Sequence, residues 1–196
     1  MNVLVDTLPS TVKIGGKNYP INTDFRAGVK FEMLIMKGED NFITLLKPFF
    51  PDKIPADLEG ALKAVELFYC CGSLPEKNDK PESKKIAYSF AADSEAIFAD
   101  FWQYYNIDLS QEGLHWWTFR ALLFGLPEKS EFKQRIYYRT VDTKNLSKGE
   151  QKRIKKLRAI YEIKDETTQK LTLEERNAGW LEYLAKRTKE TTEGVE

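Results

Sequence analysis

Along this chain the apolar residues recur mostly at helical spacing, three or four positions apart. After the capping residues Thr23 and Asp24, apolar residues fall one turn apart up to Gly38, which predicts a first helix. The same spacing, with capping residues before it and Gly, Asn or Pro after it, predicts further helices. These helices are expected over residues 40–47, 57–71, 93–105, 130–137, 147–161 and 172–187.

Near the N-terminus the helical spacing gives way to alternating apolar and polar residues. Val12–Ile14 and Tyr19–Ile21 flank a turn over Gly15–Asn18, whose two glycines supply the positive φ angles that tight turns require. Pro20 restricts the second strand to an edge. Because an isolated hairpin is only marginally stable, we expect this one to lie against the helices or to pair with another chain.

The most apolar stretch runs from Leu114 to Gly125, and we expect it to lie at the centre of the fold. Apolar residues occupy every face of a helix drawn through it, as in a helix packed on several sides. This helix is expected to begin at Asp108 or Ser110 and to end at Gly125. The side chains predicted to form the structural core here and on the preceding helix are Trp102, Leu114, Trp116, Trp117, Phe119 and Leu122.

The pattern as a whole predicts a mainly α fold, a compact helical domain with a small N-terminal β-hairpin and an aromatic-rich central helix. The 196 residues suffice for one substantial core, so we expect a single domain over residues 1–196. Its N-terminal hairpin and helices span 1–73, and its helical body spans 86–187. The proline-flanked, charged stretch between them predicts a mobile loop over 74–85, and the tail 188–196 is expected to fray.

Composition and charge exclude several classes of protein. A chain with 42% apolar and 13% aromatic residues is not disordered throughout. No apolar run approaches the roughly 20 residues of a membrane-spanning helix, and the N-terminus lacks the basic region of a secretory signal. Thirty basic and thirty acidic side chains cancel, so no overall field attracts nucleic acid or a membrane surface.

No motif in the sequence predicts catalysis, a cofactor or a metal site. The adjacent Cys70 and Cys71 point in different directions on a helix and have no nearby His or Cys, so we expect buried, reduced thiols. His115 is the one histidine. No Ser, Cys or carboxylate stands at a spacing that suggests a catalytic partner, so His115 is expected to pack or to cap a helix. We therefore expect no enzymatic activity, no catalytic residue and no cofactor.

Charge is uneven in one place. Between Lys133 and Arg158 the chain has ten basic residues and two acidic ones. Such a basic helix can dock a partner protein, bind nucleic acid or form a plain solvated face, and these alternatives stay open. The segment lacks the second short helix and tight turn of a helix-turn-helix reader, so nucleic acid is the less favoured of the two partners. The residues predicted to bind a partner protein are Lys152, Arg153, Lys155, Lys156 and Arg158.

Several short motifs resemble one known family. They are Tyr88-Ser-Phe90, Asp93, Ile107-Asp-Leu109, Leu114-His-Trp-Trp117, Phe119-Arg-Ala-Leu122 and Tyr138-Arg139. Over roughly residues 85–165 this pattern resembles the bacteriophage gene-product-fifteen proteins of tailed phages and prophages of Gram-positive bacteria. The Leu-His-Trp-Trp segment is the most specific part of the resemblance.

The resemblance implies a function in phage tail assembly, in the cytoplasm of the bacterial host. It implies a gene beside that of the tape-measure protein, the position that tail assembly chaperones occupy. On this reading the protein transiently binds the tape-measure protein and other tail proteins before the tube polymerises, with possible self-association and without a membrane. The alternatives are a permanent structural tail or connector component of the virion and a nucleic-acid-binding helical protein.

Overall fold

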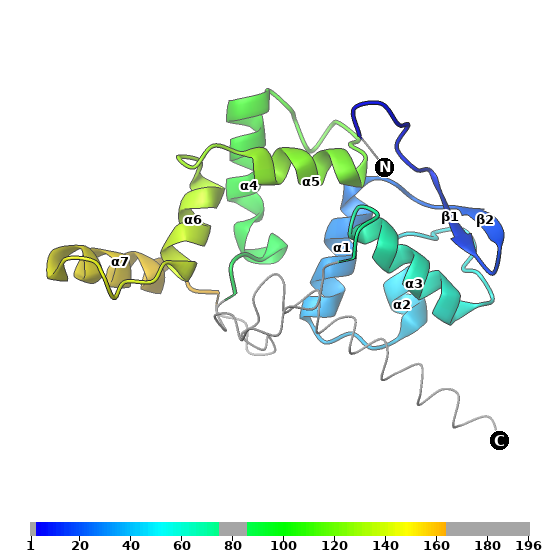
Figure 1. The fold of residues 1–196 in the computed structure, drawn as a ribbon, viewed down its shortest axis with the longest axis horizontal. Coiled ribbons are helices and arrows are strands. Elements are labelled where there is room, and N and C mark those ends of the chain that lie inside the picture. Colours follow the sequence, from blue (N-terminus) through cyan, green and yellow to red (C-terminus); the bar gives the residue numbers. More distant parts are fainter. Residues whose placement is uncertain (1–2, 75–85, 164–196) are drawn as a thin grey trace, which may run out of the picture.

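The computed structural model describes residues 3–74 and 86–163, and within these ranges the fold is mainly α, as predicted (Figure 1). The N-terminal hairpin lies at one end and the last described helix projects from the other. The elements are β1 (Thr11–Ile14), β2 (Lys17–Pro20), α1 (Phe25–Met36), α2 (Phe42–Leu46), α3 (Leu58–Tyr69), α4 (Phe90–Tyr105), α5 (Trp116–Gly125), α6 (Glu131–Thr140) and α7 (Lys148–Tyr161).

Three predictions concern residues outside the described ranges. The loop expected over 74–85 lies there except for Leu74, and so do the helix expected from Thr172 and the frayed tail. The single domain over residues 1–196 therefore stays a prediction. Within the described ranges, one cluster of buried apolar side chains extends from Ile14 of β1 to Phe132 of α6.

The N-terminal hairpin forms as predicted, with a tighter turn. Gly15 and Gly16 both have positive φ angles, +54° and +81°, which are those of a two-residue type I′ turn. Lys17 and Asn18, expected in the turn, pair with β1 instead. Ile14 is buried and β1 contacts α3, so the hairpin lies against the helices.

Helix α5 lies in the apolar core, with Trp116, Trp117 and Phe119 buried. The Trp116 indole N–H donates to the carbonyl oxygen of Tyr69 at 2.9 Å, and that of Trp117 donates to Phe68 at 2.7 Å. Both tryptophans are thereby tied to the end of α3. Of the other predicted core residues, Leu114 and Leu122 are partly buried and pack against the same cluster.

The predicted start of the central helix, at Asp108 or Ser110, is wrong. A turn follows Asp108, and the helix does not begin before His115, because the backbone there pairs with the segment before α1. The N–H of Phe25 donates to Leu114 at 2.8 Å, and that of Trp116 donates to Thr23 at 2.7 Å. His115 is the N-cap of α5, since its Nδ1 accepts the Trp117 N–H at 3.1 Å. This capping role is one of the two that the sequence predicted.

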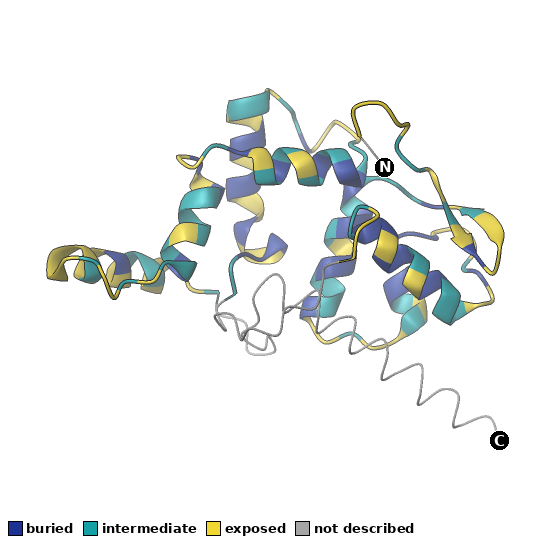
Figure 2. Ribbon diagram, in the orientation of Figure 1, coloured by how far each residue is buried: buried dark blue, intermediate teal, exposed yellow. Residues whose placement is uncertain are grey.

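Two predictions about α4 are also wrong. The helix begins at Phe90 with Ser89 as its N-cap, so Asp93 lies inside the first turn, where it is buried. Trp102, predicted to be in the core, is 53% exposed. Figure 2 shows that buried and exposed stretches alternate along α4. The apolar residues buried on this helix include Ile97 and Phe101, whereas Trp102, the next residue, is turned to another side of the helix.

Gly28 allows α1 to approach α5 closely. A Cβ atom on Gly28 would lie 2.4 Å from Cε3 of Trp116, inside van der Waals contact with a fully buried ring. We expect Gly28→Ala to lower the free energy of unfolding by about 1–3 kcal/mol, as for other overpacked cores, in urea or thermal unfolding. The control is Gly149→Ala on α7, where a Cβ meets no atom within 4 Å.

Gly149→Ala should leave stability unchanged or raise it by about 0.5–1 kcal/mol, because alanine restricts the unfolded chain. Equal effects of the two substitutions would contradict the close packing of α1 on the Trp116 ring.

Glu66 of α3 is a buried carboxyl group. It is 4% exposed, and its Oε1 has no hydrogen-bond partner among the described residues. Burial raises its pKa from 4.5 to about 7, against the opposing charge of Lys63. Between pH 4.5 and about pH 7 the Glu66 carboxyl is therefore more often protonated in the folded chain than in the unfolded chain. The stability that this provides is therefore complete below pH 4.5 and is lost as pH rises through about 7.

We expect Glu66→Gln, which cannot ionise, to remove this loss. Between about pH 5 and pH 8 the wild-type chain should lose roughly 2 kcal/mol relative to the variant, measured by urea unfolding across the pH series. Glu128→Gln, at an exposed glutamate, is the control for the substitution itself. Parallel stability curves for the wild type and Glu66→Gln would contradict the raised pKa.

Candidate functional site

Helix α6 is fixed to α4 by two buried carboxylates. Asp100 accepts the backbone N–H groups of Glu131 at 3.1 Å and Phe132 at 2.8 Å, at the N-terminus of α6. Asp93 accepts two hydrogen bonds from Arg139, at 2.6 and 2.8 Å. Buried charges are stable only when they are paired in this way. The geometry of α6 relative to the core is therefore well defined.

Helix α7 is attached to α6 mainly through arginines. Arg158 donates to the carbonyl oxygens of Tyr138 at 2.9 Å and Val141 at 2.7 Å. Arg139 donates to that of Tyr161 at 2.6 Å, and the Tyr138 and Tyr161 rings stack. Arg158 was predicted to bind a partner, but its guanidinium holds α7 in place. Helix α7 begins with a capping box, in which the Ser147 side chain accepts the Glu150 N–H and the Glu150 side chain accepts the Ser147 N–H.

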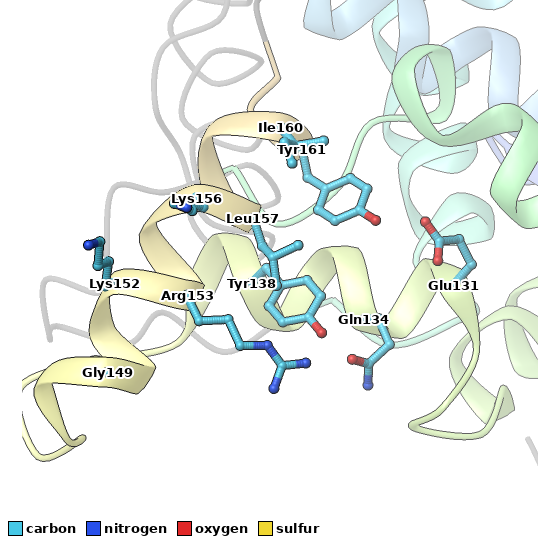
Figure 3. Close-up of a pocket in the computed structure, with 10 residues that line it drawn as sticks. All are labelled: Glu131, Gln134, Tyr138, Gly149, Lys152, Arg153, Lys156, Leu157, Ile160 and Tyr161. Carbon is cyan, nitrogen blue, oxygen red and sulfur yellow. The ribbon is translucent and has the colours of Figure 1, made fainter.

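A basic groove of about 620 Å³ lies between α6 and α7 (Figure 3). Arg153 reaches toward Tyr138 and Gln134, whereas Lys152 and Lys156 stand on the outer side of α7. The apolar wall includes Ile160, which is 71% exposed. The lining residues are Glu131, Gln134, Tyr138, Gly149, Lys152, Arg153, Lys156, Leu157, Ile160 and Tyr161.

The structure thus divides the five predicted partner-binding residues. Lys152, Arg153 and Lys156 line the groove, Lys155 is exposed outside its lining, and Arg158 is partly buried and bonded to backbone carbonyl groups. Two other arginines of the basic run have partners within the chain, because Arg135 and Arg139 pair with Asp93. The exposed charge of this segment is therefore smaller than its sequence suggests, and most of it lies on α7.

A second surface, the aromatic face of α4, was missed in the sequence. Phe98 and Trp102 stand one turn apart and are 42% and 53% exposed, with Ala91 and Glu95 exposed on the same side. The sequence of α4 has two neighbouring apolar stripes, one containing Phe101 and the other containing Phe98 and Trp102. Only the stripe containing Phe101 packs on α5. Two large apolar side chains exposed one turn apart make this side of α4 a candidate contact surface.

A third surface, the thiol hollow, opens between the end of α3 and α5. Its volume is about 330 Å³, and it is lined by Val3, Cys70, Cys71, Trp117, Arg120, Ala121 and Phe124. Both cysteines are free, as expected, but they are only partly buried. Burial raises the pKa of Cys70 to about 11 against the influence of Arg120, and it also raises the pKa of Cys71. At neutral pH both groups are therefore protonated thiols, and the hollow is mostly apolar.

Residues 3–74 and 86–163 contain no cluster of His, Cys, Asp and Glu side chains arranged to hold a metal ion. No helix in these ranges combines the length and apolar character needed to span a membrane. The absence of enzymatic activity stays an expectation.

Comparison with known families matches residues 4–163 to the family described as Bacteriophage Gp15 protein. A search of curated proteins and a search of solved structures found no match. The matched range includes nearly all the described residues, among them α5 with its two tryptophans and the helices that form the groove. The family is one of phage structural or morphogenesis proteins, which interact with other phage proteins. The chain therefore belongs to the Bacteriophage Gp15 protein family, as its motifs predicted.

Proposed function

We propose that this protein is a tail assembly chaperone that transiently binds the tape-measure protein before the tail tube polymerises. Its client would be a long, largely helical chain that several copies cover in succession. Such binding must be reversible, because the tube protein later displaces the chaperone. Modest contacts that are repeated along the client meet this requirement, since linked weak contacts give high total affinity without slow exchange at each one.

The observation that carries this proposal is the thiol hollow. Its mostly apolar lining can accept an apolar side chain from an amphipathic helix, the common mode by which a helix binds in a groove. Large apolar side chains also remain exposed in or near this part of the chain, namely Val3 in the hollow itself and Leu67 and Leu74 on either side of the cysteines in the sequence.

The polar component of the hollow is a single guanidinium group. Arg120 donates through Nη1 to the Tyr69 carbonyl oxygen at 2.8 Å, which fixes the side chain over the hollow. A carboxylate next to the apolar anchor of the client would meet this positive charge. The hollow therefore fits a helix that presents an apolar residue beside an acidic one.

The proposal is tested by co-expression with the tape-measure protein of the same phage. We expect the wild-type chain to keep the tape-measure protein soluble and to co-purify with it. Ala121→Glu places a carboxylate in the hollow at an exposed position of α5, and it should reduce co-purification about tenfold, as for a loss of about 1.4 kcal/mol. Ala56→Glu, in an exposed loop, is the matched control and should bind as the wild type does.

The possible results separate the function from the site. A tape-measure protein that stays insoluble and does not co-purify with the wild type would reject the chaperone. Equal binding by Ala121→Glu and the wild type would leave the function standing and exclude the hollow as the contact.

The alternative of a permanent tail or connector component makes a different prediction about mature particles. Mass spectrometry of purified virions should detect no stoichiometric amount of a chaperone, whereas a structural component would be present in many copies.

A further inference from the structure

The two remaining surfaces, the aromatic face and the basic groove, are opposite in charge. The segment 86–114, which contains α4, has five acidic residues and no basic one. Asp93 and Asp100 are used internally, so the exposed charge on this side comes mainly from Glu95 and Glu112. On α7 five exposed basic residues outnumber one exposed acidic residue; they are Lys148, Lys152, Arg153, Lys155 and Lys156, with Glu150. Glu131, the acidic residue that lines the groove, is paired with Arg135.

The two surfaces also match in their apolar chemistry. The groove offers the rings of Tyr138 and Tyr161 and the exposed side chain of Ile160, which together can receive an aromatic side chain. Trp102 is such a side chain, and a Lys or Arg of the groove rim that lies over its ring would add a cation–π interaction. Glu95, two turns before Trp102 on the same side of α4, would then lie near the basic rim.

The aromatic face cannot reach the groove of its own chain. Helix α6 lies between α4 and α7, and α4 turns its buried side, with Asp93 and Asp100, toward α6 (Figure 1). The exposed side of α4, with Trp102, therefore points away from α7. Contact between the two surfaces requires two molecules.

We propose that the aromatic face of one copy docks in the basic groove of a second copy. Because the two surfaces differ, the contact is head to tail, and each bound copy still presents a free face and a free groove. A symmetric α4–α4 pair is disfavoured, since it would bring two acidic segments together. Copies can therefore add in a row, independently of whether a client is bound.

Each contact should be weak and sensitive to salt. A large aromatic side chain buries about 150–250 Å², so two of them leave the contact below the roughly 1,200 Å² of a standard stable interface. The charges at the groove rim are solvent-exposed and are screened as the ionic strength rises. We expect association of the full chain at high protein concentration and low salt.

Sedimentation equilibrium of the full-length chain and two double variants tests the proposal. The face variant combines Glu95→Gln with Trp102→Ala, and the groove variant combines Arg153→Glu with Lys156→Glu. The wild type should associate into a concentration-dependent series at low salt. Each variant alone should associate at least tenfold more weakly, because each has lost one of the two surfaces.

A mixture of the two variants provides the sharpest result. The groove variant keeps its aromatic face and the face variant keeps its groove, so an equimolar mixture should form one-to-one dimers and nothing larger. The control combines Ile43→Ala with Lys17→Glu, which changes an exposed apolar residue and an exposed charge elsewhere, and should associate as the wild type does. Circular dichroism and thermal unfolding confirm that every variant is folded.

Three outcomes would overturn the proposal. They are a wild-type chain that stays monomeric at low salt, a groove variant that associates as strongly as the wild type, and a mixture of the variants that stays monomeric.

Discussion

The packing of Trp116 is the constraint on which the rest of the structure depends. Its ring lies against Gly28 of α1, its indole N–H is bonded to the end of α3, and Phe90 of α4 contacts it edge to face. The backbone around it pairs with residues 23–25, since the Trp116 N–H donates to Thr23 and the Phe25 N–H donates to Leu114. The position at which α5 begins is therefore set by a segment far earlier in the chain. Phe25 of that segment also stacks on Phe119 of α5. One buried side chain thus orders four helices.

The second tether is polar. Asp93 and Asp100 are buried on the same side of α4, one binding the guanidinium groups of α6 and the other its N-terminal amides. Breaking such a pair leaves an uncompensated buried charge, which is why these contacts hold α6 in one orientation. Asp93 also neutralises Arg135 and Arg139, which belong to the basic run between Lys133 and Arg158. The remaining exposed charge lies on α7, beside apolar side chains that suit protein contacts.

Much of the fold was predictable because its signals are local. Turn glycines, capping residues and helical spacing gave the hairpin and the approximate positions of the helices, and the Leu-His-Trp-Trp motif identified the family. The errors share a non-local cause. The start of α5 depends on a distant backbone segment, and Asp93 and Arg158 are used by distant partners. Trp102 differs from Phe101 by one position, and periodicity alone does not say which of two adjacent stripes is covered.

Helix α7 contributes one buried residue, Ile154, and is held mainly by arginine bonds to backbone carbonyl groups. Backbone acceptors are independent of the side chains that carry them. The outer surface of this helix can consequently change by mutation while its attachment and the interior of the protein stay the same. A phage lineage could change the surface chemistry of this helix, residue by residue, at little cost to folding.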